Sequence, residues 1–170
     1  GYFYITRYEK GGEYPIHSRK KENLEAEDEV LLNVNELAKG YDYYATGGLS
    51  VSPNNNILAF GEDTVSRRQY NIRFKNLETG EYLEDRIGNT TGGVAWANDN
   101  KTVFYTKKDP QTLRSNQIYR HVLGTSVDED VLIFEEQDET FYSYVYRMKS
   151  GKYLVIGSSS TMSDEVRILD

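Results

Sequence analysis

The sequence predicts an all-β protein built from repeats, and three observations support this prediction. Short runs of apolar and aromatic residues recur along the chain, separated by turn residues, as in antiparallel sheets. Of the 170 residues, 15 are tyrosine, which suits strands because the ring packs while the hydroxyl reaches water. Finally, a segment in the middle of the chain occurs twice, about 45 residues apart, which is a spacing typical of repeat architectures.

The N-terminal part of the chain predicts a hairpin and a single turn of helix. Strand-like residues from 2 to 9 and from 14 to 21 flank Gly11-Gly12, which predicts a hairpin turn. Asn35 would cap the helical turn and Gly40 would end it. No other segment shows a helical period over a useful length.

Two copies of a four-strand unit follow. The segment GGLSVS at 47–52 matches GGVAWA at 92–97, and each copy continues with three more strand-like runs. One four-stranded sheet cannot cover both of its faces, whereas sheets stacked around an axis bury each face against a neighbour. The prediction is a partial β-propeller with two complete four-stranded blades and two partial blades, at 1–34, 43–87, 91–134 and 142–170.

The ends of the chain predict a piece of a longer protein. The first residues, Tyr2-Phe3-Tyr4-Ile5, and the last, 165–170, both show a strand pattern, and no initiator methionine is present. An incomplete ring would expose edge strands and apolar surface. We therefore expect the isolated chain to associate with itself.

Composition argues against several classes of function. The formal net charge is −7 and the sequence pI is about 5.0, which disfavours binding to nucleic acid. No apolar stretch has the length of a membrane span. The chain has no cysteine, so disulfide and thiolate chemistry are excluded and a cytoplasmic location is expected.

A search for catalytic motifs predicts no active site and no cofactor. The segment 48–52 (GLSVS) approaches the G-x-S-x-G nucleophile elbow but ends in serine and lies at the start of a strand. His17 and His121 lie far apart without metal-ligand spacing. The acidic runs at 25–29 and 135–139 are typical of solvated loops, and no phosphate-binding loop is present.

One pair of residues is a candidate for binding. Arg67 and Arg68 interrupt a loop, 62–69, between two strands of one blade. Loops on a rigid scaffold often carry binding groups, although a solvated basic pair would have the same sequence.

Three segments together resemble a known family. They are GGLSVSPNNN at 47–56, DTVSRRQYNIRFKNLETG at 63–80, and VAWANDNKTVFY at 94–105, which runs on to QIYRH at 117–121. In order and spacing they resemble the propeller of the prolyl oligopeptidase family of serine peptidases, and within it the oligopeptidase B type. The resemblance spans nearly the whole chain.

The resemblance implies a function for the parent protein. In this family a seven-bladed propeller covers an α/β-hydrolase domain that carries a Ser-Asp-His triad. The propeller admits short peptides to that domain. Oligopeptidase B types cleave after Lys or Arg. This chain lacks the hydrolase domain, so we expect it to be non-catalytic. Arg68, beside Arg67, matches an arginine that faces the cleft between the domains. Asp42 matches an acidic position of an inter-domain ionic cluster, where the family can have the longer Glu.

Three alternatives remain open at this point. A propeller that only binds proteins would have the same blade period, although the Gly-His and Trp-Asp pairs typical of WD40 repeats are absent. A prolyl-specific oligopeptidase would share the same propeller. A propeller glycosidase would need two close carboxylates at the mouth of the channel.

Overall fold

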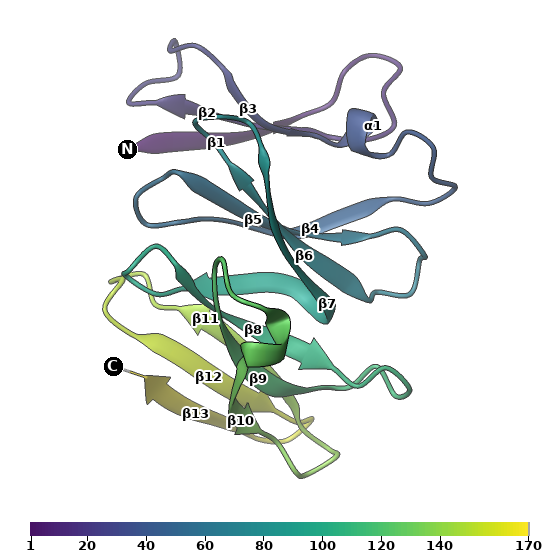
Figure 1. Cartoon of the computed structure of the whole chain (residues 1–170), viewed down its shortest axis with the longest axis vertical. Helices are drawn as coiled ribbons and strands as arrows, with labels where there is room; N and C mark the ends of the chain where they lie inside the picture. The colour runs from purple at the N-terminus through teal and green to yellow at the C-terminus, as the bar shows by residue number, and fades with distance from the viewer. Residues whose placement is uncertain (170) are drawn as a thin grey trace. The chain divides into compact units, whose positions relative to one another are not determined.

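The computed structural model describes residues 1–169, and it is composed mainly of antiparallel sheets (Figure 1). The predicted all-β fold class is confirmed. The chain forms two compact units, Gly1–Ala45 and the remainder from Thr46. Asp170, the last residue of the predicted fourth blade, lies outside the described residues. The division into blades at the predicted boundaries stays a prediction.

The first unit is a three-stranded antiparallel sheet with one short helix. Its strands are β1 (Tyr2–Arg7), β2 (Ile16–Lys21) and β3 (Glu29–Asn33), in that order across the sheet. β1 and β2 form the predicted hairpin, and Gly11 in its turn has a positive φ of 87°, a conformation that glycine adopts without strain.

The helix α1 (Val34–Leu37) corrects the predicted capping. Asn33, not Asn35, is the N-cap, because its side chain accepts a hydrogen bond from the Asn35 backbone N–H at 3.1 Å. The Asn35 side chain instead bonds the backbone of Tyr14, accepting from its N–H at 3.0 Å and donating to its carbonyl at 2.8 Å. Asn35 therefore joins the helix to the segment just before β2.

The second unit contains a seven-stranded sheet in the order β10-β9-β8-β7-β6-β5-β4. The central strand, β7, has 15 residues and serves both halves of the sheet. Its first part pairs with β6, for example Ile72 with Ile87, and its last part pairs with β8, for example Trp96 with Val103. The strands are β4 (Ala45–Val51), β5 (Ile57–Asp63), β6 (Tyr70–Asn76), β7 (Tyr82–Trp96), β8 (Thr102–Lys108), β9 (Ser115–Val122) and β10 (Val131–Glu135).

A third sheet completes the second unit. It consists of β11 (Tyr142–Arg147), β12 (Leu154–Ser159) and β13 (Asp164–Leu169), paired antiparallel in that order. A 3₁₀ turn over Val127–Glu129 precedes β10.

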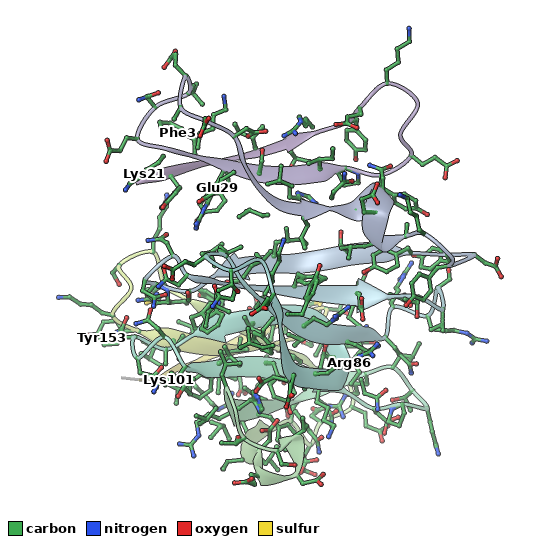
Figure 2. All side chains as sticks on the ribbon, turned by 45° about the horizontal axis from the view of Figure 1, so that its top comes forward. Phe3, Lys21, Glu29, Arg86, Lys101 and Tyr153 are labelled. Atoms are coloured by element: carbon green, nitrogen blue, oxygen red, sulfur yellow. The ribbon has the colours of Figure 1, made fainter. Side chains whose placement is uncertain are left out.

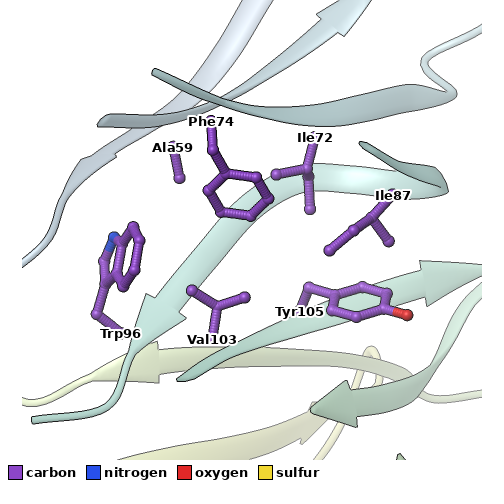
Figure 3. Close-up of a cluster of buried hydrophobic side chains, with 7 residues drawn as sticks. All are labelled: Ala59, Ile72, Phe74, Ile87, Trp96, Val103 and Tyr105. Carbon is purple, nitrogen blue, oxygen red and sulfur yellow. The ribbon is translucent and has the colours of Figure 1, made fainter. Parts of the chain in front are cut away.

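The main apolar cluster lies between the two halves of the seven-stranded sheet (Figure 3). Trp96 belongs to it: its ring meets Phe74 edge-on with the ring centroids 6.1 Å apart, and its Nε1 donates to the Ser50 carbonyl at 3.2 Å. Each fully buried side chain of this size contributes about 1.5–3 kcal/mol. The members are Ala59, Ile72, Phe74, Ile87, Trp96, Val103 and Tyr105.

The sequence repeat has a structural counterpart in the turns. Asn55 and Asn100, which are 45 positions apart, both adopt a left-handed backbone, with φ of 66° and 61°. The two turns also contact each other, because the Asn54 backbone N–H donates to Asn100 Oδ1 at 2.7 Å. Equivalent turns of the two halves therefore lie side by side.

Candidate functional site

The predicted binding pair, Arg67 and Arg68, lies in the loop that joins β5 to β6. Asp63, the last residue of β5, organises this loop. Its Oδ1 accepts a hydrogen bond from the Val65 backbone N–H at 2.9 Å, and its Oδ2 accepts one from the Arg68 N–H at 2.7 Å. A carboxylate that bonds two N–H groups of one loop fixes its turn. Both arginines are exposed.

The same loop is bound to its neighbour, the loop between β8 and β9. Lys108, the last residue of β8, donates from Nζ to the Arg68 carbonyl at 2.8 Å. Gln69 Nε2 donates to the Pro110 carbonyl at 3.3 Å. The two loops therefore form one connected rim, and the position of the arginines depends on both halves of the seven-stranded sheet.

Positive charge is concentrated at this rim. Among residues 1–169, no hydrogen bond or ion pair engages the guanidinium of Arg67 or Arg68. Burial lowers the pKa of Lys108, the positive charge of Arg68 lowers it further, and Asp63 partly opposes both effects. Cations that are held together without side-chain acceptors favour an anion as their partner, and a carboxylate matches guanidinium geometry well.

A third loop is joined to the rim through Arg114. Its Nε donates to the Phe141 carbonyl at 3.0 Å and its Nη2 donates to the Glu136 carbonyl at 3.1 Å. Arg114 therefore ties the connection between β10 and β11 to the start of β9. All of these contacts involve backbone carbonyl groups, so the role of Arg114 is to hold the loop.

Asp42 lies on the short connection between α1 and β4, where it is exposed beside Tyr41. It belongs to the first unit, whereas Arg68 belongs to the second. Its membership of an inter-domain ionic cluster stays a prediction.

Ser50 and His121, which were predicted not to be catalytic, have structural roles. Ser50 is within β4, and its carbonyl accepts the bond from Trp96. His121 is fully buried, with Nδ1 2.6 Å from Asp130 Oδ1 and Nε2 3.0 Å from Asp85 Oδ1. Because a carboxylate occupies each ring nitrogen and solvent does not reach the ring, His121 cannot serve as a general base for a peptide substrate.

The buried network around His121 was not predicted from the sequence. Tyr105 extends it by donating from its hydroxyl to Asp130 Oδ2 at 2.8 Å, and burial together with this contact raises the tyrosine pKa. Its acidic members come from β7 and from the residue before β10, 36 and 9 positions away from His121. No local sequence pattern marks a contact of this kind.

The first acidic run also has a structural explanation. Asp28 pairs with Arg7, and Glu29, which is labelled in Figure 2, pairs with Arg19 of the neighbouring strand. Among residues 1–169, no group of three or more acidic, histidine or cysteine side chains could hold a metal ion. Within that same part of the chain, no helix is long and apolar enough to cross a membrane.

Comparison with sequence families gives a match over residues 1–170 to the family described as prolyl oligopeptidase, N-terminal beta-propeller domain. Among curated proteins, the chain is 41% identical to a dipeptidyl aminopeptidase BI of Pseudoxanthomonas mexicana over 98% of its own length. It is 36% identical to a protease 2 of Moraxella lacunata over 99% of its length. It spans 25% of each of these relatives.

Solved structures agree with this match. The chain superposes on oligopeptidase B from Leishmania major with a TM-score of 0.92 and 32% identity, covering 99% of this chain and 24% of that one. It superposes on oligopeptidase B from Trypanosoma brucei with covalently bound antipain with a TM-score of 0.90 and 30% identity, covering 99% of this chain and 24% of that one.

Proposed function

Because this chain belongs to the prolyl oligopeptidase family and corresponds to its N-terminal β-propeller domain, we propose that it is the non-catalytic propeller portion of a serine oligopeptidase. The parent enzyme hydrolyses short peptides after Lys or Arg, and the propeller controls their access to an α/β-hydrolase domain. The oligopeptidase B relatives support this substrate class, since they cover the chain at 30–32% identity.

The observation that carries the proposal is the basic rim. The guanidinium groups of Arg67 and Arg68 stand on a loop whose backbone is fixed by Asp63 and Lys108. A rigid cationic rim is suited to a carboxylate of the hydrolase domain or of a peptide substrate. Asp42 would contribute to an inter-domain ionic cluster of the parent enzyme, although its side chain is shorter than the glutamate that the family can have there.

The proposal is tested with fluorogenic peptides. The chain alone should give only background hydrolysis of an Arg-Arg peptide, whereas the longer protein should cleave it and be blocked by a serine-directed inhibitor. Arg68→Ala in the longer protein should lower kcat/KM while leaving the melting temperature nearly unchanged. Inhibitor-sensitive turnover by the chain alone would refute the non-catalytic role of the chain. Unchanged kinetics in Arg68→Ala would refute the role of Arg68.

A second specificity is favoured by one comparison. The relative with 41% identity is named a dipeptidyl aminopeptidase, so the parent could instead release dipeptides from a free N-terminus. Peptides with free and acetylated N-termini distinguish the two activities. An endopeptidase cleaves both, whereas a dipeptidyl aminopeptidase requires the free amine.

The isolated chain is also proposed to self-associate. β1 and β13 each lie at the edge of a sheet, and Phe3 (45% exposed; Figure 2) and Ile168 (61% exposed) leave apolar surface beside those edges. Unpaired edges and apolar patches favour association. Light scattering over a dilution series should show a dimer or larger species, and a monomer at high micromolar concentration would contradict the proposal.

A cytoplasmic location is likewise proposed, since a chain without cysteine suits a reducing compartment.

A further inference from the structure

The backbone of the Arg67–Arg68 loop is strained at two places. Ser66 and Arg68 adopt left-handed conformations, with φ of 60° and 54°. Residues with a Cβ atom adopt this region at an energetic cost and keep it only where surrounding contacts enforce it. Contacts around this exposed basic loop must therefore hold the backbone of Ser66 and Arg68 in the left-handed conformation.

Two side chains form hydrogen bonds with the main chain of Arg68, one with its N–H and one with its carbonyl. Asp63 accepts from its N–H at 2.7 Å, and Lys108 donates to its carbonyl at 2.8 Å. Asp63 belongs to the same hairpin as the loop, whereas Lys108 belongs to β8 in the next half of the sheet. The conformation of Arg68 is therefore set in part by a residue 40 positions away.

The direction of the Lys108 side chain depends on an irregularity in β8. The pairing of β8 with β9 shifts between Lys107, which faces Gln117, and Lys108, which faces Ser115. Such irregularities re-aim a side chain relative to a regular strand. Lys107 instead lies over the Tyr119 ring, with Nζ 4.9 Å from its centroid. Two adjacent lysines thus have different partners.

The positive charge of Lys108 is electrostatically unfavourable beside Arg68. Lys108 is half-buried and close enough to Arg68 for the like charge to lower its pKa. A neutral donor could hold the Arg68 carbonyl without this repulsion. The ammonium group both fixes the loop and adds a second positive charge beside the guanidinium.

We propose that Lys108 is a positioning residue that acts through Arg68, by fixing the left-handed main chain from which the Arg68 side chain reaches its carboxylate partner. This inference rests on the proposed function of Arg68. The two ideas fail separately, because loop fixation is measured on the chain itself and the role of Arg68 is measured in the longer enzyme.

The first experiment is limited trypsin digestion of the chain, followed by mass spectrometry of cleavage after Arg67 and Arg68. Lys108→Met keeps the length of the side chain but removes the donor, so cleavage in this loop should accelerate on the order of tenfold. Lys107→Met is the matched control and should change the rate less than about twofold. Equal rates in the two variants would overturn the proposal.

The second experiment is a double-mutant cycle in the longer enzyme with the Arg-Arg peptide. Lys108→Met should lower kcat/KM, Lys108→Arg should restore most of it, and Lys108→Met combined with Arg68→Ala should be no worse than Arg68→Ala alone, because coupled residues are not additive. Additive losses would overturn the positioning role while the proposed function stands. Unchanged kinetics in Arg68→Ala, with loop cleavage still accelerated by Lys108→Met, would refute the proposed role of Arg68 and leave the loop contact in place.

Discussion

The approach of β5 to β7 gives a sharp prediction, because it is so close that only glycine fits. A Cβ atom added to Gly61 would lie 2.5 Å from the Gly92 Cα and 2.8 Å from the Gly92 carbonyl oxygen. Both of these are backbone atoms, which cannot move aside as the end of a side chain can. Gly61→Ala must therefore displace one strand of the sheet.

The magnitude follows from what overpacking does to a dense interior. Inserting a methyl group where no space exists costs about 1–3 kcal/mol. For a chain of this length each kcal/mol lowers the melting temperature by about 2–4 °C, so Gly61→Ala should melt roughly 2–12 °C below the wild type. Gly93→Ala is the control, since its Cβ would be 3.8 Å from the nearest atom, the Gly48 Cα. This variant should be neutral or more stable by up to about 1 kcal/mol.

The assay is urea and thermal unfolding followed by tryptophan fluorescence. The chain has a single tryptophan, Trp96, which is 2% exposed and lies in the cluster between the same two halves of the sheet. Its emission therefore reports on the region that Gly61→Ala disturbs. Equal stability of Gly61→Ala and Gly93→Ala would show that the strands do not approach as closely as the structure has them.

Three other predictions concern stability. Arg68→Gly should be about 1 kcal/mol more stable than Arg68→Ala in urea unfolding, because glycine lacks the Cβ penalty at a φ of 54°; equal stabilities would contradict the strain. His121→Leu should lower the unfolding free energy by about 3–5 kcal/mol, since it removes the histidine that lies between the buried carboxylates of Asp85 and Asp130 and leaves them with neutral donors, the Gly124 N–H and the Tyr105 hydroxyl; a loss below about 1 kcal/mol in urea unfolding would refute this. Burial raises the pKa of Asp99, but hydrogen bonds to its carboxylate outweigh burial and hold that pKa below the ordinary value of 3.8. The stability that Asp99 contributes is present above that value and is lost as the pH falls through the folded-state pKa, so wild type and Asp99→Ala should converge in melting temperature under acid conditions; a difference that is constant with pH would contradict it.

Local patterns were sufficient for much of the fold. The alternation of Tyr70, Ile72 and Phe74 with polar residues is typical of a half-buried strand, and these residues lie in β6, with Ile72 and Phe74 in the main cluster. The glycine pair at 11–12 predicted a hairpin that the structure contains. These features depend on neighbours within a few residues, where turn chemistry and the two-residue period of strands act directly.

Local reasoning was wrong where two chemically equivalent residues compete. Asn33 and Asn35 are both suited to cap a helix, and Asn35 was the predicted cap. Asn35 instead bonds Tyr14, 21 positions away, and that contact leaves the cap to Asn33. A preference for a residue type does not decide between two candidates when a distant partner engages one of them.

The sequence by itself determined the all-β class, the repeat and the family, because these depend on periodic patterns and on motifs in a fixed order. It also identified Arg67 and Arg68 as a loop pair. Only the tertiary structure decided that Lys108 rather than Lys107 reaches the Arg68 carbonyl, and that His121 lies between two carboxylates. The physical reason is that sheet register and packing bring together residues 9 to 40 positions apart. Register and packing cannot be predicted from the local order of residue types.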